Sequence, residues 1–451
     1  GARRRGVEAH PLHEVGAVDP GGGHLDDRFA GLREGVGHVG EQRPHWPVDR
    51  GFDRSYSLIS GATNYFRLDP ERRLARDDQA IQPEPSWYIT DAISDNAVGF
   101  IRQHCQQPRH EPQHPPQHPH DAAAANQPFF LYVAYTAPHW PLHALKPDIQ
   151  KYLGRYRIGW DTLRRERHRK QIELGLVKSN WSLSPRDPEV RSWDTVPDPE
   201  DRDLRMAVYA AQIDRMDQGI GKILAALEQA NAMANTLVLF LADNGGCAEI
   251  INQGRPGAPA GHADSFLSYG VGWANASNTP FRLYKHYVHE GGISSPLIVH
   301  WPSGVAGKGR LVHEPSHLVD IMATCVDVAA ARYPQTRGDA PIQPREGRSL
   351  LPLFQGQPSL PPRALFWEHE GNRAVRKGDW KLVGRFRRPW ELYDVSADRT
   401  ELNDLAERHP DLVRELASLH DDWAARCGVI PWQPTRPSTA PAVKKQAANQ
   451  P

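Results

Sequence analysis

Three short apolar runs along the chain have the pattern of strands that are buried on both faces. They cover Phe129–Tyr135, Leu237–Leu241 and Leu297–Trp301, and near-continuous apolar character is typical of strands in parallel sheets. Between Met206 and Leu227 the apolar residues instead recur every three or four positions, which predicts an amphipathic helix. This alternation of strands with helices predicts an α/β fold with a mostly parallel sheet flanked by helices.

The pattern changes after Gly347 to short strands separated by turns, followed by a helical segment at Pro410–Arg426. We therefore predict an α/β domain over 41–347 and a small C-terminal subdomain over 348–432, made of an antiparallel sheet and one packed helix. The stretch 106–127 is rich in Pro, Gln and His and predicts an exposed insertion in the first domain. The polar residues 433–451 predict a disordered tail.

The first forty residues differ in composition from the rest of the chain. They use only ten residue types and show no hydrophobic periodicity. All of these types except Phe can be encoded by G/C-rich codons, as an out-of-frame reading of a G/C-rich gene would give. We therefore expect 1–40 to be an atypical segment, disordered or mistranslated, and the α/β domain to be truncated or frame-damaged at its amino terminus. A natural flexible tail is the alternative.

Charge and hydropathy narrow the classes of function. The 451 residues include 54 basic and 54 acidic side chains, so the formal net charge is zero. This balance predicts no nucleic-acid partner and no binding to a membrane surface. No apolar run reaches the roughly 18 residues of a membrane span, so none is expected. We find no signal peptide in the sequence, and the compartment stays open.

Polar groups at the ends of the predicted strands supply candidate chemistry. Asp243 and Asn244 follow the second strand directly and offer two hard oxygen ligands, which favour Ca²⁺ or Mg²⁺ over zinc. An Asx turn that caps the next segment is the alternative. His139 follows the first strand and could donate to an anion, whereas Lys285 could hold a tetrahedral anion as a point charge. A core histidine and a solvated lysine are the ordinary interpretations of these two residues.

The order and spacing of these groups resemble one known family. From Glu41 to about Trp432 the chain resembles the sulfatases of the alkaline-phosphatase superfamily. The passages that carry this resemblance are Pro128–Pro141, Ala210–Asp217, Leu241–Gly246, Tyr284–Gly292 and Trp390–Leu405. The resemblance implies an alkaline-phosphatase-like fold and an arylsulfatase-like sulfuric ester hydrolase. Its substrate would be a sulfate monoester of a carbohydrate or an aryl alcohol, and its location periplasmic or secreted.

The resemblance also assigns roles to individual residues. Asp243 and Asn244 match a pair of calcium ligands, while His139 and Lys285 match the histidine and lysine that bind sulfate and act in catalysis. His38 matches the catalytic histidine that assists the nucleophile. The lysine that the family carries two residues before this histidine is replaced here by Val36.

One feature of the family is expected to be missing. Sulfatases convert the Cys or Ser of Cys/Ser-x-Pro-x-Arg to formylglycine, and an early Asp-Asp pair completes their calcium site. None of the four cysteines stands in this motif, and in Ser182–Arg186 the proline is one position too late. We therefore expect the motif to be absent and the chain to be inactive as written. The alternatives are a non-catalytic anion-binding pseudo-sulfatase, or a phosphodiesterase or phosphonate hydrolase of the same superfamily.

Overall fold

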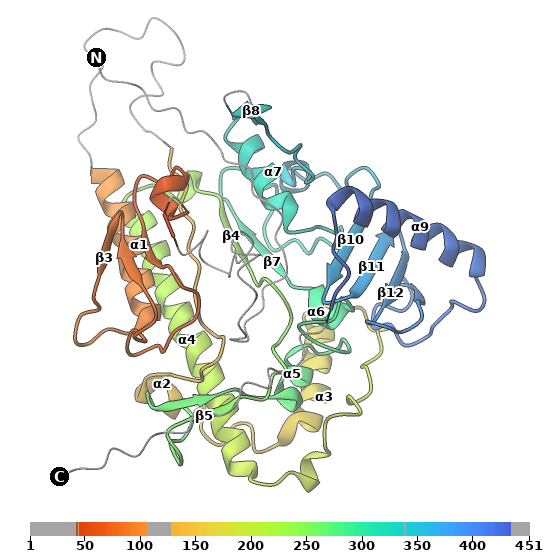
Figure 1. The fold of residues 1–451 in the computed structure, drawn as a ribbon, viewed down its shortest axis with the longest axis horizontal. Coiled ribbons are helices and arrows are strands. Elements are labelled where there is room, and N and C mark those ends of the chain that lie inside the picture. The colour runs from red at the N-terminus through yellow and green to blue at the C-terminus, as the bar shows by residue number, and fades with distance from the viewer. Residues whose placement is uncertain (1–41, 44, 107–127, 338–339, 434–451) are drawn as a thin grey trace, which may run out of the picture.

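The computed structural model describes residues 42–433 except 44, 107–127 and 338–339 (Figure 1). The segment 1–40 with His38, the insertion after Gln106 and the tail after Gln433 therefore lie outside the described residues. Among the residues that are described, no helix is long and apolar enough to cross a membrane.

The predicted long helix is α4, Pro199–Gln229, and it packs along α1, Ile89–Gln106 (Figure 1). Proline occupies the first turn of α4 and acidic residues follow it, which suits the exposed N–H groups and the positive end of the helix dipole. Ile101 of α1 meets Ala226 and Leu227 of α4 in one apolar cluster. This helix pair forms one side of the fold.

Two of the three predicted strands pair with each other at the centre of the fold. They are β4, Val238–Leu241, and β7, Leu297–His300. The two strands run antiparallel, with Leu241 opposite Leu297. The prediction of a mostly parallel sheet is not confirmed, because every strand pair in the described part of the chain is antiparallel.

The β4–β7 ribbon is buried on one face only. Leu239 and Val299 pack under Leu350, but Phe240 and Ile298 on the other face are 39% and 58% exposed. The continuous apolar run therefore predicted the strands correctly but not their second buried face. Apolar sequence shows what a strand can bury, whereas its neighbours decide what it does bury.

The third predicted strand, Phe129–Tyr135, is wrong as a strand. The segment is extended but carries no strand assignment, and Phe130 and Tyr132 are more than half exposed. A strand is defined by hydrogen bonds to a neighbouring strand. The described residues provide no such neighbour for this segment.

The remaining elements surround this centre. The strands are β1 Tyr56–Leu58, β2 Leu74–Arg76, β3 Gln79–Ile81, β5 Asn252–Gly254, β6 Ser265–Leu267, β8 Thr336–Arg337 and β9 Ala340–Pro341. The helices are α2 Lys146–Gln150, α3 Gly159–Glu173, α5 Val271–Ser277, α6 Glu290–Ile293, α7 Val319–Val328 and α8 Leu351–Phe354, and short 3₁₀ turns lie at Pro47–Arg50, Trp193–Thr195 and Met233–Asn235.

A core of three tryptophans fixes α5 against α3. The rings of Trp160, Trp193 and Trp273 lie within 5.6 Å of one another, centroid to centroid, and Trp273 is fully buried. Gly272 allows this contact, because a Cβ there would lie 2.7 Å from the Trp160 ring. The core anchors the chain just before the segment that carries Lys285.

The C-terminal region forms the predicted antiparallel sheet with one helix on it (Figure 1). The sheet contains β10 Ala364–His369, β11 Asn372–Lys377, β12 Trp380–Gly384 and β13 Glu391–Asp394, in that order. Helix α9, Pro410–Cys427, covers one face through Leu416, which packs against Leu382. Glu370, in the turn between β10 and β11, contacts His286 of the site described next.

Candidate active site

His139 and Lys285, which are 146 residues apart in the sequence, meet in the structure. The distance from Lys285 Nζ to His139 Nε2 is 3.5 Å. His139 Nδ1 lies 2.8 Å from the carbonyl oxygen of Trp140, which can only accept, so Nδ1 carries the proton and the Nε2 lone pair faces the ammonium group of Lys285. Burial, and then the positive charge of Lys285, lower the pKa of His139 below its ordinary value. The imidazole is therefore neutral at neutral pH.

Two glycine-rich turns hold this pair in place. The N–H of Gly245 donates to the carbonyl of Gly292 at 2.8 Å, and the N–H of Lys285 donates to the carbonyl of Gly246 at 3.1 Å. A Cβ on Gly245 would lie 1.9 Å from the carbonyl oxygen of Gly291, so only glycine permits this approach. The turn after β4 and the turn before β7 are thus closely packed against each other.

Asp243 and Asn244 lie at the carboxyl end of β4, beside this pair. Among the described residues, neither side chain makes a hydrogen bond or an ion pair. The negative charge of Asp243 acts on His139 by raising its pKa, against the larger lowering by burial and Lys285. Two unpaired oxygen donors suit a hard cation, which takes six to eight oxygens when it is Ca²⁺. The described residues bring no further carboxylate or histidine cluster to Asp243. The pair therefore fits part of a Ca²⁺ or Mg²⁺ site.

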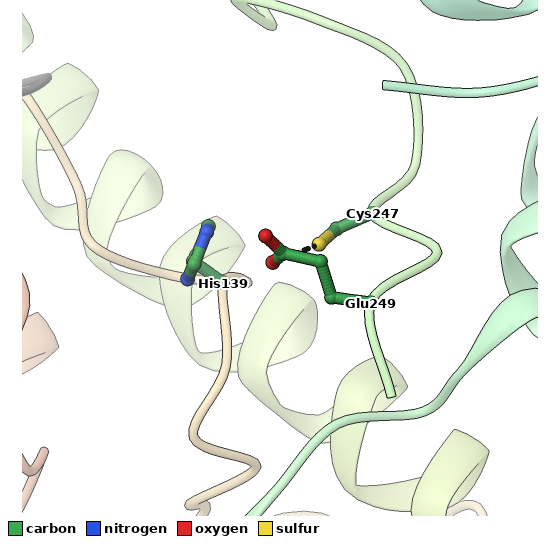
Figure 2. Close-up of side chains that lie close together, drawn as sticks. All are labelled: His139, Cys247 and Glu249. Carbon is green, nitrogen blue, oxygen red and sulfur yellow. Dashed lines mark hydrogen bonds between the residues drawn. The ribbon is translucent and has the colours of Figure 1, made fainter. Parts of the chain in front are cut away.

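Glu249 is a neighbour of the pair that sequence reasoning missed (Figure 2). Its Oε2 accepts from Trp140 Nε1 at 2.6 Å and from Cys247 Sγ at 2.9 Å. Burial alone would raise the pKa of Glu249, but hydrogen bonds from His286, Cys247 and Trp140 lower it to about 2. Glu249 is therefore a fixed negative charge next to His139.

His286 joins this carboxylate to the C-terminal sheet. Its Nδ1 donates to Glu370 at 2.8 Å, its Nε2 lies 3.5 Å from Glu249, and its ring stacks on that of His369. Its backbone has φ = +82°, an unfavourable value for a residue with a Cβ, and this turns the ring toward both carboxylates. Hydrogen bonds to Glu249 and then to Glu370 raise the pKa of His286 to about 9.

A buried ion cluster packs against the Gly291–Gly292 turn. Lys381 of β12 is fully buried and lies 2.7 Å from Glu290 and 2.8 Å from Glu401. Glu401 also accepts from the backbone N–H of Glu290 at 2.9 Å. Burial would raise the pKa of Glu290, but Arg399 and Lys381 hold it well below its usual range. Because Glu290 begins the Gly291–Gly292 turn, the C-terminal sheet positions the backbone on which Gly245 rests.

The expectation about the formylglycine motif needs a correction. Ser359-Leu360-Pro361-Pro362-Arg363 matches Ser-x-Pro-x-Arg, and sequence reasoning overlooked it. Ser359 is exposed in the loop before β10, and Arg363 binds the buried carboxylate of Asp320 on α7. Neither residue has a described contact with His139 or Lys285. This serine therefore does not fit the place of a nucleophile at the site.

Sequence reasoning named His139, Lys285, Asp243 and Asn244, and the structure places all four at adjoining turns, with only His139 and Lys285 in direct contact. It missed Cys247 and Glu249, although both follow Asn244 within five residues. Nothing in the sequence marked His286, Glu370 or Lys381, because their partners lie at least 20 residues away along the chain.

Comparisons with known proteins identify the family of this chain. The sulfatase family model matches residues 116–331. An uncharacterized sulfatase of Schizosaccharomyces pombe is 30% identical over 452 residues, covering 90% of this chain and 79% of that protein. The arylsulfatase of Klebsiella aerogenes is 26% identical, covering 72% of this chain and 70% of its own length. The crystal structure of Ps i-CgsB in complex with k-i-k-neocarrahexaose aligns with a TM-score of 0.57 at 23% identity, covering 86% of this chain and 70% of the other.

The chain belongs to the sulfatase family. Its relatives are named as sulfuric ester hydrolases, which generally use a metal ion and a formylglycine. The structural likeness shows that the chain shares the fold of Ps i-CgsB.

Proposed function

We propose that the turns after β4 and before β7 form the sulfate-binding part of an arylsulfatase-like site for a sulfate monoester of a carbohydrate or an aryl alcohol. The observation that carries this proposal is the 3.5 Å approach of Lys285 Nζ to His139 Nε2. A buried ammonium group that has no carboxylate within ion-pair distance needs an anion. Among the described residues Lys285 has no acidic partner, so a bound anion would supply that charge.

Each residue has a defined part in holding the ester. Lys285 pairs with a sulfate oxygen as a point charge. His139 contributes Nε2, which accepts a proton as the anion binds and then donates a hydrogen bond to a sulfate oxygen. Asp243 and Asn244 would hold Ca²⁺, or Mg²⁺, which would supply further positive charge to stabilise the anion. In the family, formylglycine supplies the nucleophile that attacks sulfur.

The described residues offer no group for that last role. Ser359 carries the only Ser-x-Pro-x-Arg sequence that we find, and it faces solvent in another part of the fold. We therefore propose that this chain as written has little or no turnover. The second candidate function, a non-catalytic pseudo-sulfatase that binds anions, is favoured by the same observation, because binding needs Lys285 and His139 but no nucleophile.

The test measures anion binding separately from turnover. Isothermal titration calorimetry with 4-nitrophenyl sulfate, in the presence of Ca²⁺, is performed on the full chain and on Lys285→Ala. A hydrogen bond to a charged group contributes about 1.5–3 kcal/mol, so the variant should bind roughly ten- to a hundredfold more weakly. The matched control is Lys222→Ala, which removes an exposed lysine paired with Asp95 on the far helices.

Equal affinity of Lys285→Ala and the unchanged chain would remove Lys285 from the site and overturn the proposal. Release of 4-nitrophenol is followed on the same samples. Binding without release supports the pseudo-sulfatase function, and rapid release would show that the proposed inactivity is wrong.

A further inference from the structure

Three side chains at the edge of the proposed sulfate site converge on one point (Figure 2). The imidazole of His139, the thiol of Cys247 and the carboxylate of Glu249 each present one ligand atom, and these atoms lie within 4.8 Å of one another. The carboxylate lies between the other two groups, and Cys247 Sγ is 2.9 Å from Glu249 Oε2. All three residues are partly buried, so the cluster is neither in open solvent nor sealed.

Two of the three groups are already in the protonation state that a metal ligand needs. The hydrogen bond from His139 Nδ1 to the Trp140 carbonyl leaves the Nε2 lone pair available, which is the usual second-shell arrangement of a metal-binding histidine. Glu249 is ionised, because its pKa is about 2. Only Cys247 still carries a proton, which it donates to Glu249.

We propose that His139, Cys247 and Glu249 form a binding site for a borderline divalent transition ion such as Zn²⁺. One nitrogen, one sulfur and one oxygen are ligands that zinc accepts together, and three protein ligands leave its fourth position for water. This site is distinct from the hard-cation site proposed at Asp243 and Asn244, which offers oxygen only.

The geometry requires a small adjustment. Tetrahedral zinc with ordinary bond lengths places its ligand atoms roughly 3.3–3.8 Å apart. The three atoms now span up to 4.8 Å, so they must close by about an ångström, which rotation of the Cys247 and Glu249 side chains can supply. On binding, the Cys247 S–H bond breaks, its proton goes to solvent, and the thiolate binds the ion. Zinc, thiolate and carboxylate then sum to zero net charge.

Occupation of this site excludes a bound sulfate, a consequence that rests on the proposed function. His139 Nε2 cannot bind zinc through its lone pair and at the same time carry the proton that it would donate to a sulfate oxygen. Lys285, which now approaches that nitrogen to 3.5 Å, attracts the anion but repels the cation. Removing its charge should therefore change the two affinities in opposite directions.

The experiment uses Co²⁺ as a spectroscopic substitute for zinc. The full chain is titrated with Co²⁺ alone, and the thiolate-to-metal charge-transfer band is recorded in the near ultraviolet; Zn²⁺ affinity is then obtained by competition. We expect the band in the unchanged chain and in the control Cys325→Ser, whose cysteine lies on α7 outside the cluster. Cys247→Ser should lack the band and bind Zn²⁺ at least about a hundredfold more weakly, since even second-shell changes cost 10–100-fold.

Lys285→Met provides the second measurement. It should bind Zn²⁺ about tenfold more tightly, because even at the dielectric constant of water a unit charge about 5 Å away repels a divalent ion appreciably. A charge-transfer band that persists in Cys247→Ser, or no band in the unchanged chain, overturns the metal site. If the band behaves as expected but 4-nitrophenyl sulfate does not bind with Ca²⁺ present and Zn²⁺ and Co²⁺ absent, the proposed function fails while the transition-metal site stands. Sulfate ester binding that is unaffected by saturating Zn²⁺ overturns the exclusion.

Discussion

Replacement of His286 by glutamine should change how the stability of this protein depends on pH. His286 lies between Glu249 and Glu370, which raise its pKa to about 9 from 6.5, and its side chain is 26% exposed. The ring of His369 stacks on that of His286. The bridge connects the turn that carries the active site to the turn between β10 and β11.

The sign follows from the direction of the shift. The folded pKa is above the unfolded value, so the folded protein binds the proton more tightly, and the stabilisation is fully present below pH 6.5. It is lost as the pH rises from 6.5 through about 9. The difference corresponds to at most about 3 kcal/mol, and partial exposure of the ring lowers the expected loss to about 2 kcal/mol. The lowered pKa of Glu249 reports partly the same contact and is not added.

The assay is urea unfolding, followed by tryptophan fluorescence, at pH values from 6 to 9.5. The unchanged chain should lose about 2 kcal/mol of unfolding free energy over this range relative to His286→Gln, whose curve should be flatter. His300→Gln is the control, since this histidine is exposed at the end of β7. Parallel curves for the unchanged chain and His286→Gln would refute the assignment of a charged bridge at His286.

Three other predictions concern the supports of the site. Gly245→Ala places a Cβ 1.9 Å from a carbonyl oxygen and should destabilise the protein by about 2 kcal/mol or more in urea unfolding. The control Gly221→Ala, on α4, places its Cβ in open space and should not destabilise the protein. Equal stability of the two variants would contradict the close contact at Gly245. Lys381→Met leaves Glu401 buried without its cation and Glu290 with Arg399 alone, and should cost about 3–5 kcal/mol in the same assay. A loss no larger than that of exposed Lys377→Met would be evidence against it. Ca²⁺ at millimolar concentration should raise the melting temperature of the unchanged chain but not that of Asp243→Asn, and identical shifts in calorimetry would remove Asp243 from the metal site.

The sequence predicted the elements and residues that are marked by a local pattern of apolar and polar positions. The spacing of apolar residues located α4 to within a turn or two, and the strands β4 and β7 within one residue. The C-terminal sheet with α9 follows the predicted order. Asp243 was singled out because it follows a predicted strand directly, and in the structure it follows the end of β4.

The sequence did not predict the properties that depend on contacts between distant segments of the chain. Whether β4 and β7 run parallel or antiparallel depends on the course of the 55 residues between them, which contain a hairpin and two short helices. The segment Phe129–Tyr135 has the apolar composition of a strand, yet composition provides no hydrogen-bonding partner. The bridge at His286 needs a left-handed backbone and two carboxylates from distant segments, and neither has a local pattern.

The residues that hold the active-site turns in place determine how short a fragment of this protein can be and still keep the site. The stretch matched by the family model ends at residue 331, but Glu370, Lys381 and Glu401 lie beyond it. An excised fragment of that stretch would retain His139 and Lys285 and yet lose the salt bridges that shape the turns around them. Anyone who grafts, shortens or recombines this enzyme should therefore carry the final strands along with the anion-binding residues.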